Sequence, residues 1–145
     1  MAQFHFSLEK VLRWRALELA SEEAKLELLL REQLRLQTMR ADLSAEKSNL
    51  DRSLDTLPDL RGADLRAVGA HAASLKRQAD NLVKLVAKCH RDLSEQKKSY
   101  RAAKQRFRLL EELRARKIEE WRKEQDREQE TLATESFLAS WNRDR

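Results

Sequence analysis

The chain has 145 residues, a formal net charge of +5 and 38% charged side chains. It contains only two glycines and one proline, a composition typical of long helices and unlike that of a loop-rich compact domain. Its single cysteine excludes an internal disulfide. No apolar run approaches about 18 residues, and no signal-peptide pattern is visible. We therefore expect neither a transmembrane helix nor a cleaved signal peptide. These features favour a cytoplasmic protein.

The first predicted helix begins near Ser7, a good N-cap residue, and runs to about residue 57. Leucines recur along one of its faces, whereas the alternate heptad positions Gln33, Arg40 and Lys47 are polar. The apolar stripe is therefore narrow and needs a partner helix to cover it. The leucines of the stripe are Leu12, Leu19, Leu26, Leu29, Leu36, Leu43, Leu50 and Leu57.

Residues 58–64 predict a break between two helices. They hold the only proline, Pro58, and one of the two glycines, Gly62. Asp64 is a plausible N-cap for the helix that follows. A short break between two heptad segments indicates an αα-hairpin.

The second predicted helix spans about residues 65–138 and carries a more continuous stripe. Its apolar side chains alternate at spacings of three and four residues, which predicts a left-handed coiled coil. Gln96 is the only polar member, and Cys89 is expected to pack as a small hydrophobic residue. The stripe consists of Leu65, Val68, Ala72, Leu75, Ala79, Leu82, Val86, Cys89, Leu93, Gln96, Tyr100, Ala103, Phe107 and Leu110.

These patterns predict an all-α fold: one antiparallel coiled-coil hairpin over residues 1–145, with the second helix longer than the first. If the chain folds back near residue 61, residue i faces roughly residue 122 − i. Residues from about 116 onward then have no partner in the first helix. This unpaired part nevertheless carries large apolar side chains, including Trp121 and Trp141.

The sequence gives little support for catalysis or metal binding. His5, His71 and His90 are scattered, and no ligand cluster repeats at metal-binding spacing. There is also no glycine-rich phosphate loop and no nucleophile elbow. We therefore expect no enzymatic activity, no cofactor and no metal.

Residues 76–108 form a basic stretch, with eleven Lys and Arg against three acids and a local charge of +8. Such a stretch could track nucleic-acid phosphates. It could also bind an acidic protein surface, or simply be a solvated face. Tyr100 and Phe107 lie on the apolar stripe, so exposed aromatics are not interleaved with these cations. Specific nucleic-acid binding is therefore the less favoured interpretation.

The opening residues 4–15, FHFSLEKVLRWR, resemble the start of FliJ-type proteins of the flagellar type III export apparatus. Those proteins commonly open with a phrase of the form F-x-F-x-L-x-x-V-L followed by a charged helix. The chain also resembles them in length, in its predicted hairpin with a longer second helix, and in a Glu-rich segment, residues 127–130, ahead of Phe137. The resemblance implies a non-enzymatic component of bacterial flagellum biogenesis and protein transport.

The resemblance also implies partners. The open end of the coiled coil would enter the ring of the export ATPase FliI and regulate it, while other parts contact the export-gate protein FlhA and export chaperones. It implies a cytoplasmic protein, peripheral at the inner-membrane export apparatus. The implied ring contacts are Leu12, Trp14, Leu17, Ile118, Trp121 and Phe137, and the implied gate contacts are His71, Leu75 and Leu82.

Three alternatives remain at this point. Injectisome stalk proteins share the same architecture. A basic nucleic-acid-binding coiled coil would use residues 76–108. A generic coiled-coil scaffold would explain the helices without any specific partner.

Overall fold

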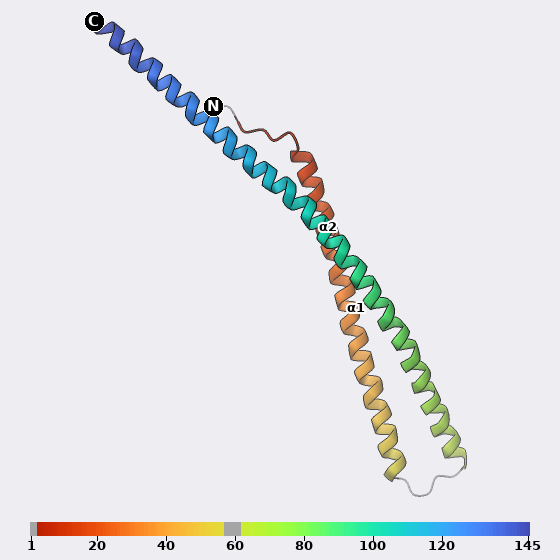
Figure 1. Cartoon of the computed structure of the whole chain (residues 1–145). Coiled ribbons are helices and arrows are strands. Elements are labelled where there is room, and N and C mark those ends of the chain that lie inside the picture. Colours follow the sequence, from red (N-terminus) through yellow and green to blue (C-terminus); the bar gives the residue numbers. More distant parts are fainter. Residues whose placement is uncertain (1–2, 57–61) are drawn as a thin grey trace. The chain divides into compact units, whose positions relative to one another are not determined.

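The computed structural model describes residues 3–56 and 62–145. It contains two α-helices, α1 (Glu9–Thr56, 48 residues) and α2 (Gly62–Arg143, 82 residues), and no strand in the described ranges (Figure 1). The predicted all-α hairpin with a longer second helix is confirmed. Neither helix has a described segment apolar enough to cross a membrane.

The helix ends differ slightly from those predicted. The Leu8 carbonyl accepts a hydrogen bond from the Leu12 N–H at 2.9 Å, and α1 begins at Glu9. Leu8 rather than Ser7 therefore occupies the N-cap position. Helix α2 begins at Gly62, which places Asp64 in its first turn, where a negative charge favours the helix dipole. The remaining predicted hinge residues, 58–61, lie outside the described residues.

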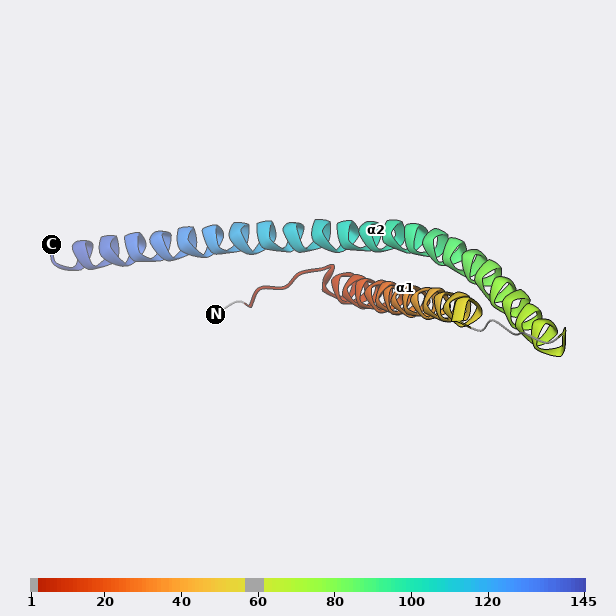
Figure 2. The same cartoon turned by 90° about the horizontal axis from the view of Figure 1, so that it is seen from below.

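The chain divides into two compact units, and each is described by itself. The hairpin unit is Ser21–Arg101. The terminal unit combines the residues up to Ala20 with residues 102–145. Helix α2 contributes to both and is drawn in Figure 2 as one uninterrupted helix.

The hairpin unit is held together by a narrow seam of apolar side chains between α1 and α2. The centre of the seam consists of Leu36, Leu82, Cys89 and Leu93, with half-buried Leu26, Leu29, Leu43 and Val86 packed against it. The Cys89 thiol lies 3.8 Å from the Leu29 carbonyl oxygen. The predicted packing of Cys89 as a small buried residue is confirmed.

The register of the hairpin unit is shifted from the predicted one. Folding about residue 61 places residue 93 opposite Leu29 and residue 100 opposite Glu22. The observed partners are Cys89 and Gln96, about one helical turn nearer the hinge. The shift follows from the early start of α2. If Thr56, the last residue of α1, is set opposite Gly62, the first residue of α2, antiparallel pairing places residue 89 opposite Leu29.

The terminal unit pairs the start of the chain with the second half of α2. Glu9 accepts a hydrogen bond from the Arg114 Nε at 3.0 Å. Before α1 begins, Phe4 meets Trp121 edge-on, with ring centroids 6.0 Å apart. Phe6 is buried in the same segment. The non-helical residues ahead of α1 therefore continue along α2.

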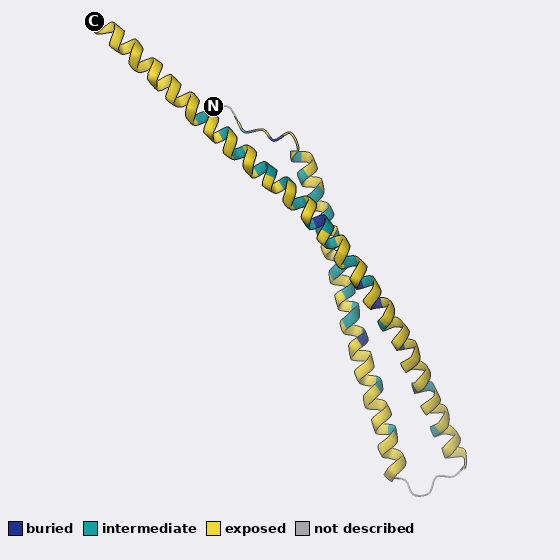
Figure 3. Cartoon of the chain, viewed as in Figure 1, coloured by how far each residue is buried: buried dark blue, intermediate teal, exposed yellow. Residues whose placement is uncertain are grey.

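The segment ahead of α1 shortens the part of α2 that has no packing partner. We expected residues from about 116 onward to lack a partner in the first helix, and here the non-helical N-terminal segment packs against them: Trp121 is half-buried against Phe4, and Gln125 is also half-buried. An extended residue advances about 3.3 Å and a helical one about 1.5 Å, so a few residues of the N-terminal segment cover a longer stretch of α2. Residues 126–145 are all exposed (Figure 3). We call residues 126–143 the C-terminal extension.

The seam predicts a sharp contrast between two leucines of α1. Leu36 is 2% exposed in the centre of the seam, whereas Leu34 is 64% exposed. Truncating a buried leucine to alanine costs about 2–5 kcal/mol, because apolar contacts are lost and a cavity remains. We expect Leu36→Ala to lower the free energy of unfolding by that amount in urea titrations followed by circular dichroism.

Leu34→Ala is the matched control, since it makes the same change in the same helix at an exposed position. Its free energy of unfolding should stay within about 0.5 kcal/mol of the wild-type value. Equal losses in the two variants would mean that Leu36 does not lie in the seam.

Candidate interaction surfaces

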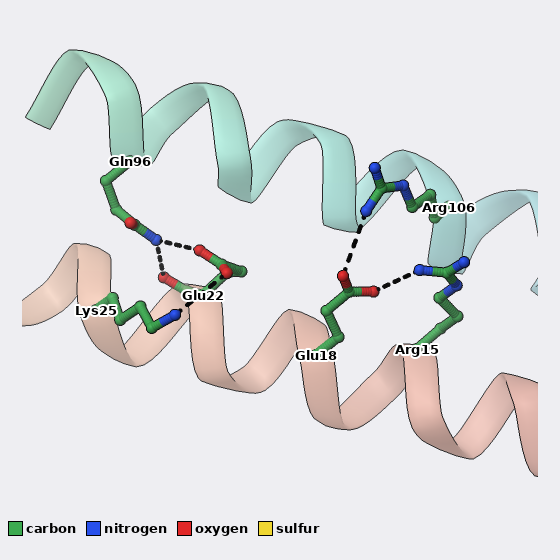
Figure 4. A network of polar contacts seen from close by, with 6 residues as sticks. All are labelled: Arg15, Glu18, Glu22, Lys25, Gln96 and Arg106. Carbon is green, nitrogen blue, oxygen red and sulfur yellow. Dashed lines mark hydrogen bonds and ion pairs between the residues drawn. The ribbon is translucent and has the colours of Figure 1, made fainter.

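The half-buried side chain of Gln96 makes hydrogen bonds across the seam of the hairpin unit. Its Nε2 donates to the Glu22 backbone carbonyl at 3.0 Å and to the Glu22 carboxylate (Figure 4). The Lys25 Nζ lies 3.4 Å from the same carboxylate. The one polar interruption of the stripe is therefore satisfied across the interface. A satisfied polar group fixes a register, because any shift would leave its donor unpaired between apolar side chains.

A second cluster, in the terminal unit, is centred on Glu18. Its carboxylate accepts from the Arg15 Nη1 at 2.8 Å and from the Arg106 Nη1 of α2 at 3.3 Å (Figure 4). Hydrogen bonding by Arg15, opposed by desolvation and aided by the positive charges of Arg15 and Arg106, lowers the pKa of Glu18 below its ordinary value. The carboxylate is thus kept ionised, and the cluster links the two helices by charge.

The side chains predicted to contact an ATPase ring all lie in the terminal unit, but they differ in exposure. Trp14, Leu17 and Phe137 are exposed. Leu12, Ile118 and Trp121 are half-buried, and Trp121 packs against Phe4. Half of the set therefore contributes to packing within the chain.

The residues predicted to contact the export gate lie in the hairpin unit and differ in exposure. Leu75 is 6% exposed and Leu82 is 4% exposed, because both point into the seam of the hairpin unit. Both line hollows between α1 and α2, so only a small part of each side chain is open to a partner. His71 is exposed, with its Nε2 3.5 Å from the Glu46 Oε1. Of these three residues, only His71 is available at the surface.

The structure adds two exposed residues that the predicted ring contacts lacked, Leu138 and Trp141. The rings of Phe137 and Trp141 lie 6.1 Å apart, and the Arg145 guanidinium lies 5.7 Å from the Trp141 ring. The sequence signal was the spacing of four residues between the two aromatics, which places them on one helix face. These residues lie beyond Leu110, where the predicted stripe ends, so the stripe alone did not reveal this face.

The cations of the basic stretch in the hairpin unit are exposed, as a phosphate-binding or acid-binding face requires. The only aromatic residue of this unit, Tyr100, is half-buried. Base stacking therefore has no freely exposed ring to use here. The cations are Lys76, Arg77, Lys84, Lys88, Arg91, Lys97, Lys98 and Arg101.

Within the described residues, no group of three His, Cys, Asp or Glu side chains is arranged to hold a metal ion. A cleft of about 620 Å³ in the terminal unit lies beside the N-terminal segment. It is lined in part by Lys10, Arg13 and Arg114, next to Phe4 and Phe6. Such a lining suits an anionic or aromatic contact better than bond-making chemistry.

No protein-family model, no curated protein and no solved structure matches this chain.

Proposed function

We propose that this protein is a non-enzymatic, cytoplasmic component of the flagellar type III protein export apparatus, peripheral at the inner membrane. In this role its terminal unit inserts into the ring of the export ATPase FliI, and its hairpin unit faces the export gate protein FlhA. Export chaperones are further partners. The proposal rests on the resemblance of residues 4–15 to the opening of FliJ-type proteins.

The observation that carries the proposal is the exposed aromatic face of the C-terminal extension. Phe137 is 62% exposed and Trp141 is 53% exposed, on a helix whose residues from 126 onward are all exposed. Large aromatics contribute most of the binding energy at protein interfaces. A helix that is polar on its other faces gains little stability from its own packing. Both points favour a partner that surrounds this helix.

The proposed mechanism is asymmetric contact. A single helical hairpin inside a six-fold ring touches only some subunits at one time, so each contact distinguishes one subunit from its neighbours. Binding that favours one subunit conformation shifts the ring towards it. The hairpin thereby couples ATP turnover to opening of the gate. Leu75 and Leu82 are almost fully buried and His71 is exposed, so in this proposal His71 is the main gate contact of the three.

Truncation after Gln125 tests the proposal. The removed residues are exposed, so the thermal melting of the hairpin should change little. Stimulation of FliI ATPase activity and cell motility should be lost. The double variant Phe137→Ala and Trp141→Ala should reduce the stimulation by about tenfold or more, since each is an exposed aromatic anchor.

Leu132→Ala is the matched control, because Leu132 is exposed on the same helix but lies about 140° around the axis from Phe137. It should leave the stimulation near the wild-type level. The proposal fails if the truncated chain stimulates the ATPase as well as the full chain does.

A nucleic-acid-binding coiled coil is the second candidate, favoured by the exposed cations of the basic stretch. Under the export proposal, binding to duplex DNA should be weak and should fall steeply between low and physiological salt, as non-specific phosphate contacts do. Fluorescence anisotropy with two unrelated duplexes measures this. Tight, sequence-preferring binding at physiological salt would favour the second candidate instead.

A further inference from the structure

A groove runs along the hairpin unit between α1 and α2. Two adjoining hollows of about 480 and 370 Å³ share Leu43 and Ala79 in their linings. Together they extend along residues 40–51 of α1 and 72–86 of α2. Their apolar lining includes Leu50, Leu75 and Val86. The groove is long enough for about three turns of a helix.

Short side chains are the cause of this groove. Ala72 and Ala79 occupy stripe positions on α2, yet both are exposed, whereas the neighbouring Leu75 and Leu82 are buried. An alanine at a coiled-coil knob position leaves the facing hole unfilled. The seam is therefore open to an additional side chain from outside at this place.

The C-terminal extension carries side chains of the complementary kind. Thr134, Phe137, Leu138 and Trp141 lie at positions i, i+3, i+4 and i+7, the spacing with which a helix inserts its anchors into an apolar groove. The last three are more than half exposed. An exposed face of this kind lowers the free energy of the chain when another protein covers it.

The charges of the two surfaces are complementary. The groove lining holds the cations Arg40, Lys47 and Lys76 against Asp51 and Asp80, and so has a net charge of +1. The extension has a net charge of −2. Its charged residues are Asp126, Glu128, Glu130 and Glu135 against Arg127 and Arg143.

We propose that the C-terminal extension of one chain docks in the groove of the hairpin unit of a second copy. The interface is heterologous, since it joins two different surfaces of the same protein. Self-association by this route goes beyond the proposed export function and does not depend on it. It uses the face that the export proposal assigns to the ATPase ring, so the two interactions exclude one another.

Sedimentation velocity over a range of protein concentrations tests the docking. The wild-type chain should show concentration-dependent association that weakens as salt screens the complementary charges. The extension variant, Phe137→Ala with Leu138→Ala and Trp141→Ala, should associate at least about tenfold more weakly. The groove variant, Ala72→Leu with Ala79→Leu, should lose association to a similar degree because its groove is filled.

Each variant has a matched control. Leu132→Ala changes an exposed leucine of the extension outside the anchor set, and Ala24→Leu changes an exposed alanine of α1 outside the groove. Both should associate like the wild type. Circular dichroism checks that all variants remain helical. Every substituted position is exposed, and none is a leucine of the seam.

Mixing the two defective variants gives the decisive result. The extension variant still has an open groove, and the groove variant still has its aromatic anchors, so an equimolar mixture should form a one-to-one complex although neither associates alone. A wild-type chain that stays monomeric at every concentration overturns the proposal. Association of wild-type strength in either variant, or a mixture that associates no better than the separate variants, also overturns it.

Discussion

The structure depends on one narrow apolar seam between α1 and α2. Each helix offers a single stripe, and neither can bury it without the other. In the hairpin unit the seam is centred on Leu36, Leu82, Cys89 and Leu93. In the terminal unit Ala103 and Phe6 are buried, and the chain ahead of α1 supplies part of the packing. Because most stripe side chains are used in the seam, contacts with other proteins are left to side chains that point away from it and to the places where short stripe residues such as Ala72 and Ala79 leave it open.

Polar contacts between α1 and α2 fix the register of the two helices, which the apolar seam alone specifies only loosely. A stripe of leucines tolerates shifts by one heptad, since each position then meets another apolar residue. Gln96 removes that freedom in the hairpin unit, because its amide is satisfied by Glu22 and would be unpaired in a shifted register. In the terminal unit the Glu18–Arg106 and Glu9–Arg114 pairs add charge contacts between the helices. Ion pairs at a solvent-accessible surface contribute little each to stability.

The sequence predicted the helical class, the hairpin and most of the seam, because 3-4 periodicity reports directly on which side chains face a partner helix. It did not predict the register of the hairpin unit, since Asp64 looked like an N-cap while α2 begins at Gly62. It also missed the pairing of Phe4 with Trp121, because non-helical residues carry no periodic signal. Leu75 and Leu82 were assigned to a partner by resemblance, although their stripe positions already indicated burial.

We propose that the C-terminal extension is the part of the chain that the export ATPase FliI covers. Hydrogen exchange of residues 126–143, measured with and without FliI, tests it most directly. Alone, this exposed helix should exchange rapidly, since it lacks tertiary packing. In the presence of the ATPase, protection should rise first around Phe137 and Trp141. Unchanged exchange in the extension, with protection elsewhere in the chain, would contradict the account.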